Sequence, residues 1–306
     1  MANENIKKEY EASLKSIETE NYLDLWFYRP LGFGIARALR HTGITPNTIT
    51  LISIFAGSAA GPLFYQNNLK YNITGILCLI SANILDCVDG QLARMTGVKS
   101  KIGRILDGLA GDIWFVLIYL FLALRLKNEF GTWLFFIPAV LSGISHLVQA
   151  NVTDYYKTLH LYFVSKEKGC EFHRPDKILL QYNEMKRGIS KILFFFYFLY
   201  TRMQEKVTPK LQTLLKSLNS KYGDDIPQYI RLDFRKKSAC LMKRLIDFMT
   251  FNGRSIILFI VVLTGHAWFY LLFEIIILNI VLTISIYKHE KICELINRKV
   301  DSGISP

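Results

Sequence analysis

The sequence predicts an all-α integral membrane protein with six transmembrane helices, an N-terminal interfacial helix and a cytosolic helical insert between the fourth and fifth spans. Three observations predict this fold. Hydrophobic residues make up 51% of the 306 residues, the net charge is nevertheless +12, and the apolar and basic residues are segregated into alternating stretches. Uncharged runs of about 20 residues match the hydrocarbon thickness that a helix crosses at 1.5 Å per residue. A water-soluble domain would not combine these properties.

Six segments are long and apolar enough to cross a bilayer. We expect transmembrane helices at residues 47 to 67, 71 to 92, 103 to 124, 131 to 151, 246 to 264 and 267 to 287. The last two need a separate argument, because the run from Ser255 to Tyr287 contains one formal charge, Glu274. As a single helix this run would measure roughly 50 Å, which is too long for one span. A turn at Thr-Gly-His, residues 264 to 266, divides it.

The charge distribution sets the orientation in the membrane. With a cytosolic N-terminus, the external loops contain only Lys70, Arg125 and Lys127 of the 37 basic residues. The positive-inside rule therefore selects this orientation. The first 40 residues lack the apolar core of a signal peptide, so both termini are expected in the cytosol. The predicted divisions are four. A cytosolic and interfacial segment covers residues 1–46, and spans 1 to 4 cover 47–151. A basic insert covers 152–245, and spans 5 and 6 with a cytosolic tail cover 246–306.

Two segments are expected to be helical without spanning. Residues 22 to 40 mix aromatic and aliphatic side chains with three arginines, which is typical of a helix in the headgroup plane. The insert at 152 to 245 carries 19 Lys/Arg and 9 Asp/Glu, so it is predicted to face anionic lipid, and it has no motif that reads nucleic acid. Its apolar run at 192 to 200 is too short to span. A seventh span would also move the C-terminus outside.

The cysteines argue against a disulfide framework and against a zinc site. They are odd in number and scattered, and no CxxC pair occurs. We expect reduced thiols at all five positions: Cys78, Cys87, Cys170, Cys240 and Cys293.

The most informative residues are carboxylates where the second span ends and the third begins. At 100° per residue, Asp86, Asp89, Gly90 and Ala93 share one sector of a helix, so two carboxylates and two small residues lie on one face. Asp107 can converge on them from the next helix. Charged groups in membrane helices indicate function. Carboxylates this close raise each other's pKa unless a cation neutralises them, and oxygen ligands without His or Cys favour Mg²⁺, Mn²⁺ or Ca²⁺. The alternative is a set of acids merely solvated at a helix end.

Seven residues at fixed spacing resemble the signature of the CDP-alcohol phosphotransferases, integral membrane enzymes that make phospholipid headgroups. The pattern reads Asp86-x2-Asp89-Gly90-x2-Ala93-Arg94-x8-Gly103-x3-Asp107. By this resemblance the three carboxylates bind one or two Mg²⁺ or Mn²⁺ ions, which hold the diphosphate of a CDP-linked substrate. The remaining residues of the pattern line the nucleotide pocket. A homodimer is also expected from the resemblance.

The sequence departs from the family pattern at its last element. A fourth aspartate, usually assigned as the base, should fall at position 111, but this chain has Gly111 followed by Asp112. In a regular α-helix Asp112 lies about 140° around the axis from Asp107 and points away from the site. We expect a π-bulge between Gly108 and Gly111 to restore its direction, which makes Asp112 the displaced base and a further metal ligand. Without the bulge, Asp107 or a metal-bound species must take the proton.

The predicted function is a membrane phosphotransferase with its active site on the cytosolic side. An acceptor hydroxyl attacks the phosphorus distal to cytidine and CMP leaves. Basic residues surround the loop between the second and third spans, and Arg94 and Arg104 are candidate phosphate contacts; the set is Arg94, Lys99, Lys101 and Arg104. These charges favour CDP-diacylglycerol as donor and a polyol such as inositol or inositol phosphate as acceptor.

Two other functions remain open. One is a phosphotransferase that uses a CDP-alcohol donor of the ethanolamine or choline type and a lipid hydroxyl as acceptor. The other is a cation transporter whose intramembrane carboxylates form an ion path. Polar residues on the fourth span are candidates for the wall of an acceptor pocket: His146, Gln149, Asn151 and Asp154. Glu274 and Asn279 are expected to serve a buried hydrogen bond or a subunit contact.

Overall fold

The computed structural model describes residues 2–98, 100–164, 180, 182–184, 188–223 and 225–302, and every regular element within these ranges is a helix. Lys99 and Cys170, which entered the sequence-based predictions, lie outside the described residues, as does part of the insert. The chain divides into two compact units. Unit 1 comprises Met1–Val148 and Phe251–Leu278, and unit 2 comprises Gln149–Thr250 and Asn279–Pro306.

Six helical segments are long and apolar enough to cross a membrane, counted over the described residues. They are Pro46–Tyr65, Leu69–Thr96, Gly103–Phe130, Trp133–Val164, Gln228–Thr264 and Ala267–Ser302. The predicted number of spans is therefore confirmed. The predicted turn between the last two is also confirmed, because Gly265 adopts a φ of +79° that only glycine takes without strain. The last two segments are longer than expected, since their apolar parts continue into polar helix.

The N-terminal part of unit 1 contains three short helices: α1 (Ala2–Ser13), η1 (Asp24–Tyr28) and α2 (Arg29–Leu39). The helix predicted at residues 22 to 40 is thus present. Tyr22 and Trp26 are exposed, whereas Tyr28 is buried. Burial, together with the neighbouring Asp24 carboxylate, raises the pKa of Tyr28 to about 12, so this phenol stays neutral at physiological pH. A helix with exposed aromatic rings on one side suits a membrane interface.

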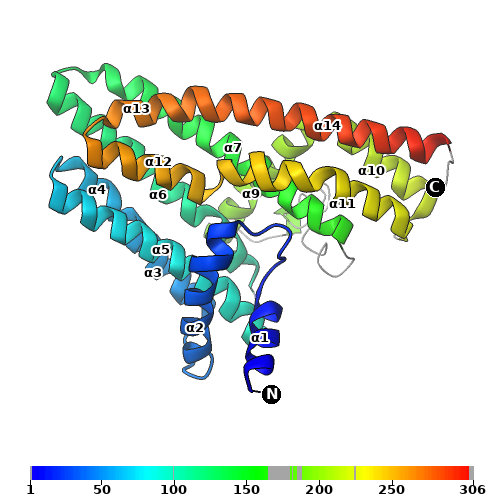
Figure 1. Ribbon diagram of the computed structural model, residues 1–306. Helices are drawn as coiled ribbons and strands as arrows, with labels where there is room; N and C mark the ends of the chain where they lie inside the picture. Colours follow the sequence, from blue (N-terminus) through cyan, green and yellow to red (C-terminus); the bar gives the residue numbers. More distant parts are fainter. Residues whose placement is uncertain are drawn as a thin grey trace. The chain divides into compact units, whose positions relative to one another are not determined.

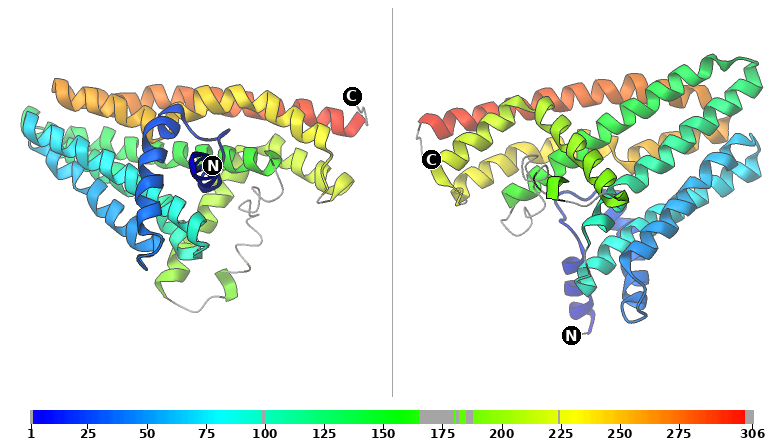
Figure 2. Two further views of the ribbon diagram at one scale, coloured as in Figure 1. Left: turned by 60° about the horizontal axis from the view of Figure 1, so that its bottom comes forward. Right: turned by 180° about the vertical axis from the view of Figure 1, so that it is seen from behind.

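The first spans of unit 1 pack around α5. The elements are α3 (Pro46–Ser58), α4 (Ala60–Tyr65), α5 (Leu69–Thr96) and α6 (Lys101–Phe130). Helix α5 contacts α2, α3 and α4, and α6 contacts α3 and α4 (Figures 1 and 2). Gly57 on α3 permits this approach, because a Cβ there would lie 2.5 Å from the ring of Trp114 on α6. Both acid-bearing helices, α5 and α6, therefore pack against α3.

Local capping signals explain where α5 and α6 end and begin. Helix α5 ends at Gly97, whose φ of +73° is the left-handed conformation that glycine adopts most readily. Helix α6 begins after Ser100, whose Oγ accepts a hydrogen bond from the Gly103 N–H at 2.8 Å. The connection spans residues 97 to 100, so the end of α5 and the start of α6 stay close. The carboxylates of the sequence motif lie at these two helix ends.

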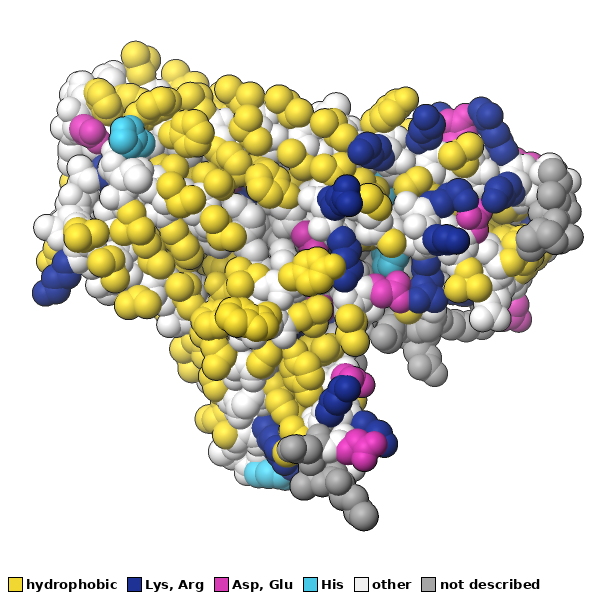
Figure 3. Space-filling model, viewed as in Figure 1, with side chains coloured by type: hydrophobic (Ala, Val, Ile, Leu, Met, Phe, Trp, Pro, Cys, Tyr) yellow, Lys and Arg dark blue, Asp and Glu magenta, His cyan; other side chains and the backbone are white. Residues whose placement is uncertain are grey.

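The rest of unit 1 comes from later spans. Its elements are η2 (Trp133–Phe135), the first part of α7 (Phe136–Val164), α12 (Phe251–Thr264), α13 (Ala267–Leu272) and η6 (Phe273–Ile277). Large apolar side chains such as Phe55, Ile260 and Phe269 are exposed, and hydrophobic side chains dominate the visible face over α5 and α12 (Figure 3). Such a surface is stable against lipid and not against water.

Unit 2 is a separate helical assembly with its own core. Besides the end of α7 it contains α9 (Ile189–Val207), α10 (Pro209–Tyr222), α11 (Gln228–Leu241), η4 (Met242–Ile246), η5 (Asp247–Met249) and most of α14 (Leu278–Ser302). Buried residues from these helices include Tyr156, Leu214, Phe234 and Ile296. The apolar run at 192 to 200 lies in α9, which is not among the candidate spans. Lys and Arg side chains gather over α11 and α14 (Figure 3).

Candidate functional site

Three carboxylates from two helices converge in unit 1. Asp86 and Asp89 lie on α5 and Asp107 lies on α6, and one oxygen from each lies within 4.8 Å of the others. Asp89 is buried, Asp86 is half-buried and Asp107 is exposed. The group is therefore accessible from one side and enclosed on the other. We call these three residues the carboxylate trio.

Thr50, which lies outside the sequence motif, holds one member of the trio in place. Thr50 on α3 is buried, and its hydroxyl donates a hydrogen bond of 2.6 Å to Asp89 Oδ2. Because hydroxyl donors fix a carboxylate without cancelling its charge, Asp89 stays oriented for a further partner. The available signal was a polar residue one turn after Pro46 in a predicted span that carries no charged residue.

Gly103 occupies the point where α3 and α6 meet. A Cβ at this position would lie 2.7 Å from Ser100 Oγ and closer still to Asn47 Oδ1. Asn47 in turn donates to Ser100 Oγ at 3.3 Å. A larger residue would displace the Asn47 and Ser100 side chains, so Gly103 has a packing role in addition to the nucleotide contact that the resemblance implies.

The predicted nucleotide residues border the N-terminal segment. The guanidinium of Arg94 lies across Gly90, since a Cβ on Gly90 would lie 3.1 Å from Arg94 Nη2. Arg94 Nε donates to the carbonyl of Ser13, and Gln91 Nε2 donates to Ser13 Oγ at 3.1 Å. The end of α1 thus fixes the plane of this guanidinium. Ala93 is half-buried beside it, and Arg104, at the start of α6, is exposed.

The π-bulge predicted in α6 is absent, and this corrects the placement of Asp112. Helix α6 is α-helical throughout Lys101–Phe130. The regular helix turns Asp112 about 140° from Asp107, as the 100° step requires. Its Oδ1 lies 3.5 Å from Nε2 of His146 on α7, and within the described residues Asp112 is not part of the group that shares the 4.8 Å limit. The structure therefore does not bring Asp112 to the trio.

Asp112 instead begins a chain of buried polar side chains in unit 1. His146 Nδ1 lies 2.9 Å from the Tyr119 hydroxyl and 3.0 Å from Arg254 Nη1, and Arg254 forms an ion pair with Glu274. Both members of that pair are buried. The expectation that Glu274 serves a buried hydrogen bond is confirmed. In unit 2, Gln149 and Asn151, which were grouped with His146 in the sequence, bond instead to Asn279 and to the Tyr200 carbonyl.

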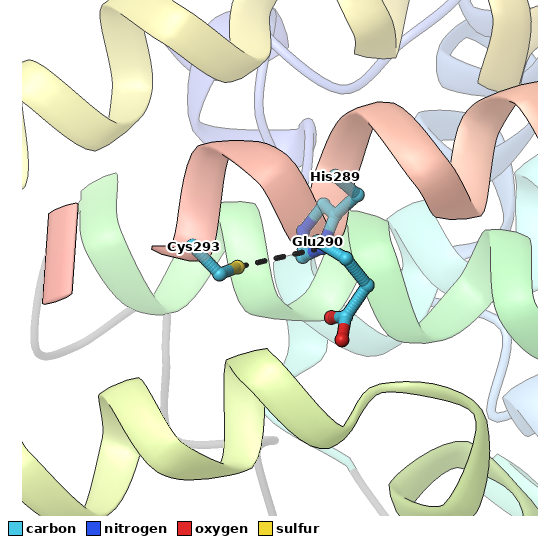
Figure 4. Close-up of side chains that lie close together, drawn as sticks. All are labelled: His289, Glu290 and Cys293. Atoms are coloured by element: carbon cyan, nitrogen blue, oxygen red, sulfur yellow. Dashed lines mark hydrogen bonds between the residues drawn. The ribbon is translucent and has the colours of Figure 1, made fainter. Parts of the chain in front are cut away.

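A second group of ligand atoms lies in unit 2 and was not expected from the sequence. His289, Glu290 and Cys293 on α14 place one ligand atom each within 4.8 Å of the others (Figure 4). Cys293 Sγ lies 3.6 Å from His289 Nδ1. Both Glu290 oxygens accept backbone N–H groups at the start of α10, from Lys210 at 2.7 Å and Leu211 at 3.3 Å. The spacing of His and Cys, one helical turn apart, was the missed signal.

Comparison with known proteins agrees with the motif. A family model described as CDP-alcohol phosphatidyltransferase matches residues 43–208. The chain is 42% identical over 73 residues to archaetidylinositol phosphate synthase of Pyrococcus horikoshii, which covers 24% of this chain and 37% of that protein. It is 32% identical over 97 residues to ceramide phosphoethanolamine synthase of Drosophila melanogaster, covering 29% of this chain and 25% of that protein.

A third relative is the CDP-diacylglycerol–serine O-phosphatidyltransferase of Helicobacter pylori, 36% identical over 70 residues, which are 23% of this chain and 28% of that protein. The chain thus spans between a quarter and about two fifths of the length of these relatives. The family model, in contrast, covers more than half of the chain and includes the motif, the trio and Thr50. The chain belongs to the CDP-alcohol phosphatidyltransferase family.

Proposed function

We propose that this protein transfers a substituted phosphate from a CDP-linked donor to the hydroxyl of an alcohol and releases CMP. The observation that carries the proposal is the convergence of three carboxylate oxygens from α5 and α6 within 4.8 Å, at the helix ends that also carry Arg94 and Gly103. A diphosphate bound through cations at this point would have its nucleoside beside Gly90 and Arg94.

The trio suits a hard divalent cation. All three donors are carboxylate oxygens, which Mg²⁺ and Mn²⁺ prefer, and the fixed partner of Asp89 is the neutral Thr50 hydroxyl. The negative charge of three neighbouring acids favours one or two such ions over an apolar or anionic ligand. When bound, the metal would neutralise charge on the diphosphate and polarise the phosphorus. Asp86, Asp89 and Asp107 would hold it.

The residues at the turn between α5 and α6 would bind the nucleotide. Gly90 and Ala93 present little side chain, so a ring or ribose can lie against the α5 backbone. The Arg94 guanidinium, oriented by the Ser13 carbonyl, would pair with phosphate, and the exposed Arg104 would make a second such contact. Gly103 would leave room for the Asn47 and Ser100 side chains beside this end of the site.

The proton of the acceptor hydroxyl would pass to Asp107. The bulge that the Asp112 assignment required is absent, and Asp107 is the exposed member of the trio. The acceptor oxygen forms its bond to the phosphorus distal to cytidine, the bond from that phosphorus to the CMP oxygen breaks, and CMP departs with the electron pair. No covalent enzyme intermediate is needed.

The donor that we favour is CDP-diacylglycerol, with a polyol such as inositol or inositol phosphate as acceptor. The names of two relatives, archaetidylinositol phosphate synthase and CDP-diacylglycerol–serine O-phosphatidyltransferase, support this choice. The similarity to ceramide phosphoethanolamine synthase favours the second candidate, a CDP-alcohol donor with a lipid hydroxyl as acceptor. The excess of basic residues on one side of the spans supports an active site and termini in the cytosol.

The test incubates the purified protein with radiolabelled CDP-diacylglycerol or CDP-ethanolamine and Mg²⁺ or Mn²⁺, across inositol, inositol phosphate, glycerol phosphate, serine and diacylglycerol as acceptors. We expect CMP release that requires an acceptor and is lost in Asp89→Asn. The absence of CMP release with every pair refutes the proposal. Uptake of Mn²⁺ into protein-containing vesicles without CMP release would assign the protein to the transporters instead.

A further inference from the structure

The buried polar residues that connect Glu274 to Asp112 determine which ring nitrogen of His146 carries the proton. An arginine can only donate hydrogen bonds, so Arg254 Nη1 at 3.0 Å makes His146 Nδ1 an acceptor. The ring proton of neutral His146 must then sit on Nε2, which faces Asp112 Oδ1 at 3.5 Å. His146 therefore presents an N–H group to Asp112, and its one basic lone pair, on Nδ1, faces Arg254 and not Asp112.

The rest of the chain keeps this arrangement rigid. Glu274, fully buried, pairs with Arg254 and so holds the guanidinium against His146. The Tyr119 hydroxyl contacts the same ring nitrogen at 2.9 Å. A buried ion pair inside a membrane domain is costly unless its geometry is good, and it is best explained by a function. Together, Glu274, Arg254 and His146 orient one carboxylate, that of Asp112.

Two glycines of α6 leave its backbone uncovered between Asp107 and Asp112. Around the helix axis, Asp107, Gly111, Gly108 and Asp112 stand at about 0°, 40°, 100° and 140°. A Cβ on Gly108 or Gly111 would meet no atom within 4 Å. An open strip of α6 backbone thus lies between the two carboxylates. Asp112 lies about 7.5 Å further along the helix than Asp107.

This strip lies on the acceptor side of the proposed reaction. Successive spans run in opposite directions, so Arg94 lies beyond Asp89 toward the α5 and α6 turn, whereas Asp112 lies beyond Asp107 away from it. In an in-line displacement the attacking oxygen and the departing CMP are on opposite sides of the phosphorus. With the nucleoside beside Gly90, toward the α5 and α6 turn, the attacking alcohol approaches from the side of Asp112.

We propose that Asp112 is an acceptor-binding residue that accepts a hydrogen bond from a second hydroxyl of a polyol acceptor, and that His146 is its positioning residue. This inference rests on the proposed function. Asp107, next to the phosphorus, takes the proton of the attacking hydroxyl, while Asp112 holds the remainder of the polyol against Gly108 and Gly111. A carboxylate suits this task because it accepts bonds from neutral hydroxyls.

The test measures steady-state kinetics of CMP release with CDP-diacylglycerol and either inositol or inositol phosphate. For Asp112→Asn we expect the KM for the acceptor to rise about tenfold or more, with kcat within about threefold and the donor KM unchanged, because a hydrogen bond to a charged group is lost. His146→Leu should raise the acceptor KM less. His146→Gln, whose amide can present an N–H near the Nε2 position, should keep the acceptor KM close to that of wild type.

The control is Ser142→Ala, which removes a buried hydrogen bond from α7 to the Leu271 carbonyl without touching the chain to Asp112. It should lower the melting temperature without changing either KM. An unchanged acceptor KM in Asp112→Asn overturns the inference, whether kcat collapses, as for a base, or stays constant. A wild-type protein that releases CMP with serine or a lipid acceptor, but with neither inositol compound, also overturns it and leaves the proposed function standing. A wild-type protein that releases no CMP at all refutes the proposed function itself.

Discussion

The carboxylate trio of unit 1 and the His289, Glu290 and Cys293 group of unit 2 satisfy the same proximity criterion, with ligand atoms within 4.8 Å of one another. They differ in what those atoms already bond. Glu290 uses both oxygens to cap α10, and the Cys293 thiol lies against His289. In the trio, Asp89 Oδ2 accepts a hydrogen bond from a neutral threonine hydroxyl.

Proximity of ligand atoms therefore does not by itself make a metal site. In unit 2 the backbone N–H groups at a helix start meet the carboxylate, which is the usual way to satisfy such groups. A cation there would have to compete with these hydrogen bonds. In unit 1 the Thr50 hydroxyl bonds Asp89 without neutralising it, and a cation would lower the repulsion among the three neighbouring acids.

The strongest test of this contrast is Asp89→Asn. We expect CMP release to fall by more than about 100-fold, because even partners outside the ligand set change metal affinity or activity by about 10- to 100-fold. The matched variant Glu290→Gln makes the same chemical change in unit 2, and its activity should remain within about threefold of wild type. Equal losses in the two variants would remove the distinction between the groups.

The second test removes the hydroxyl that orients Asp89. Thr50→Val should weaken Mn²⁺ binding by about 10- to 100-fold, since the carboxylate loses its 2.6 Å hydrogen bond. The measurement is the Mn²⁺-dependent rise in melting temperature of the detergent-solubilised protein. A ligand at 100 times its Kd stabilises the folded state by about 2.7 kcal/mol. Thr50→Ser keeps the hydroxyl and should retain most of the shift; equal shifts in both variants would show that the hydrogen bond has no part in metal binding.

The membrane fold could be predicted from the sequence because the features that determine it do not depend on contacts between distant residues. Span length, the near absence of charge and the bias of Lys and Arg are all properties of consecutive residues, and the six spans follow from them. The α5 face that carries Asp86 and Asp89 follows equally from helical periodicity.

The contacts of Thr50 and His146 could not be predicted in this way, because their partners are 39 and 34 positions distant in the sequence. Only packing between helices decides which polar residue of an apolar span meets which partner. The π-bulge was predicted wrongly for a related reason. The family spacing suggested a role for Asp112 beside the trio, but a regular helix could satisfy its carboxylate against His146 without distortion.

The third test asks what Glu290 does in unit 2. Glu290→Ala should lower the free energy of unfolding by about 1 to 2 kcal/mol, because two N–H groups at the start of α10 lose their acceptor. Thermal unfolding of the solubilised protein measures this loss. Glu290→Gln keeps one acceptor oxygen and should lower the free energy of unfolding less. The Mn²⁺-dependent shift should equal that of wild type in both variants, and a reduced shift would mean that this residue contributes to metal binding.

The smallest expected effect concerns Cys293. Cys293→Ser should change the free energy of unfolding by less than about 1 kcal/mol, because a thiol is a weak hydrogen-bond donor and its contact with His289 at 3.6 Å is long. The decisive measurement is spectroscopic: Co²⁺ added to the reduced protein should give no thiolate-to-cobalt charge-transfer absorption, since Glu290 is held by α10 and only two donors remain. Absorption that appears in wild type and disappears in Cys293→Ser would make the unit 2 group a metal site as well, and would show that hydrogen bonds to backbone N–H groups do not prevent a carboxylate here from joining one.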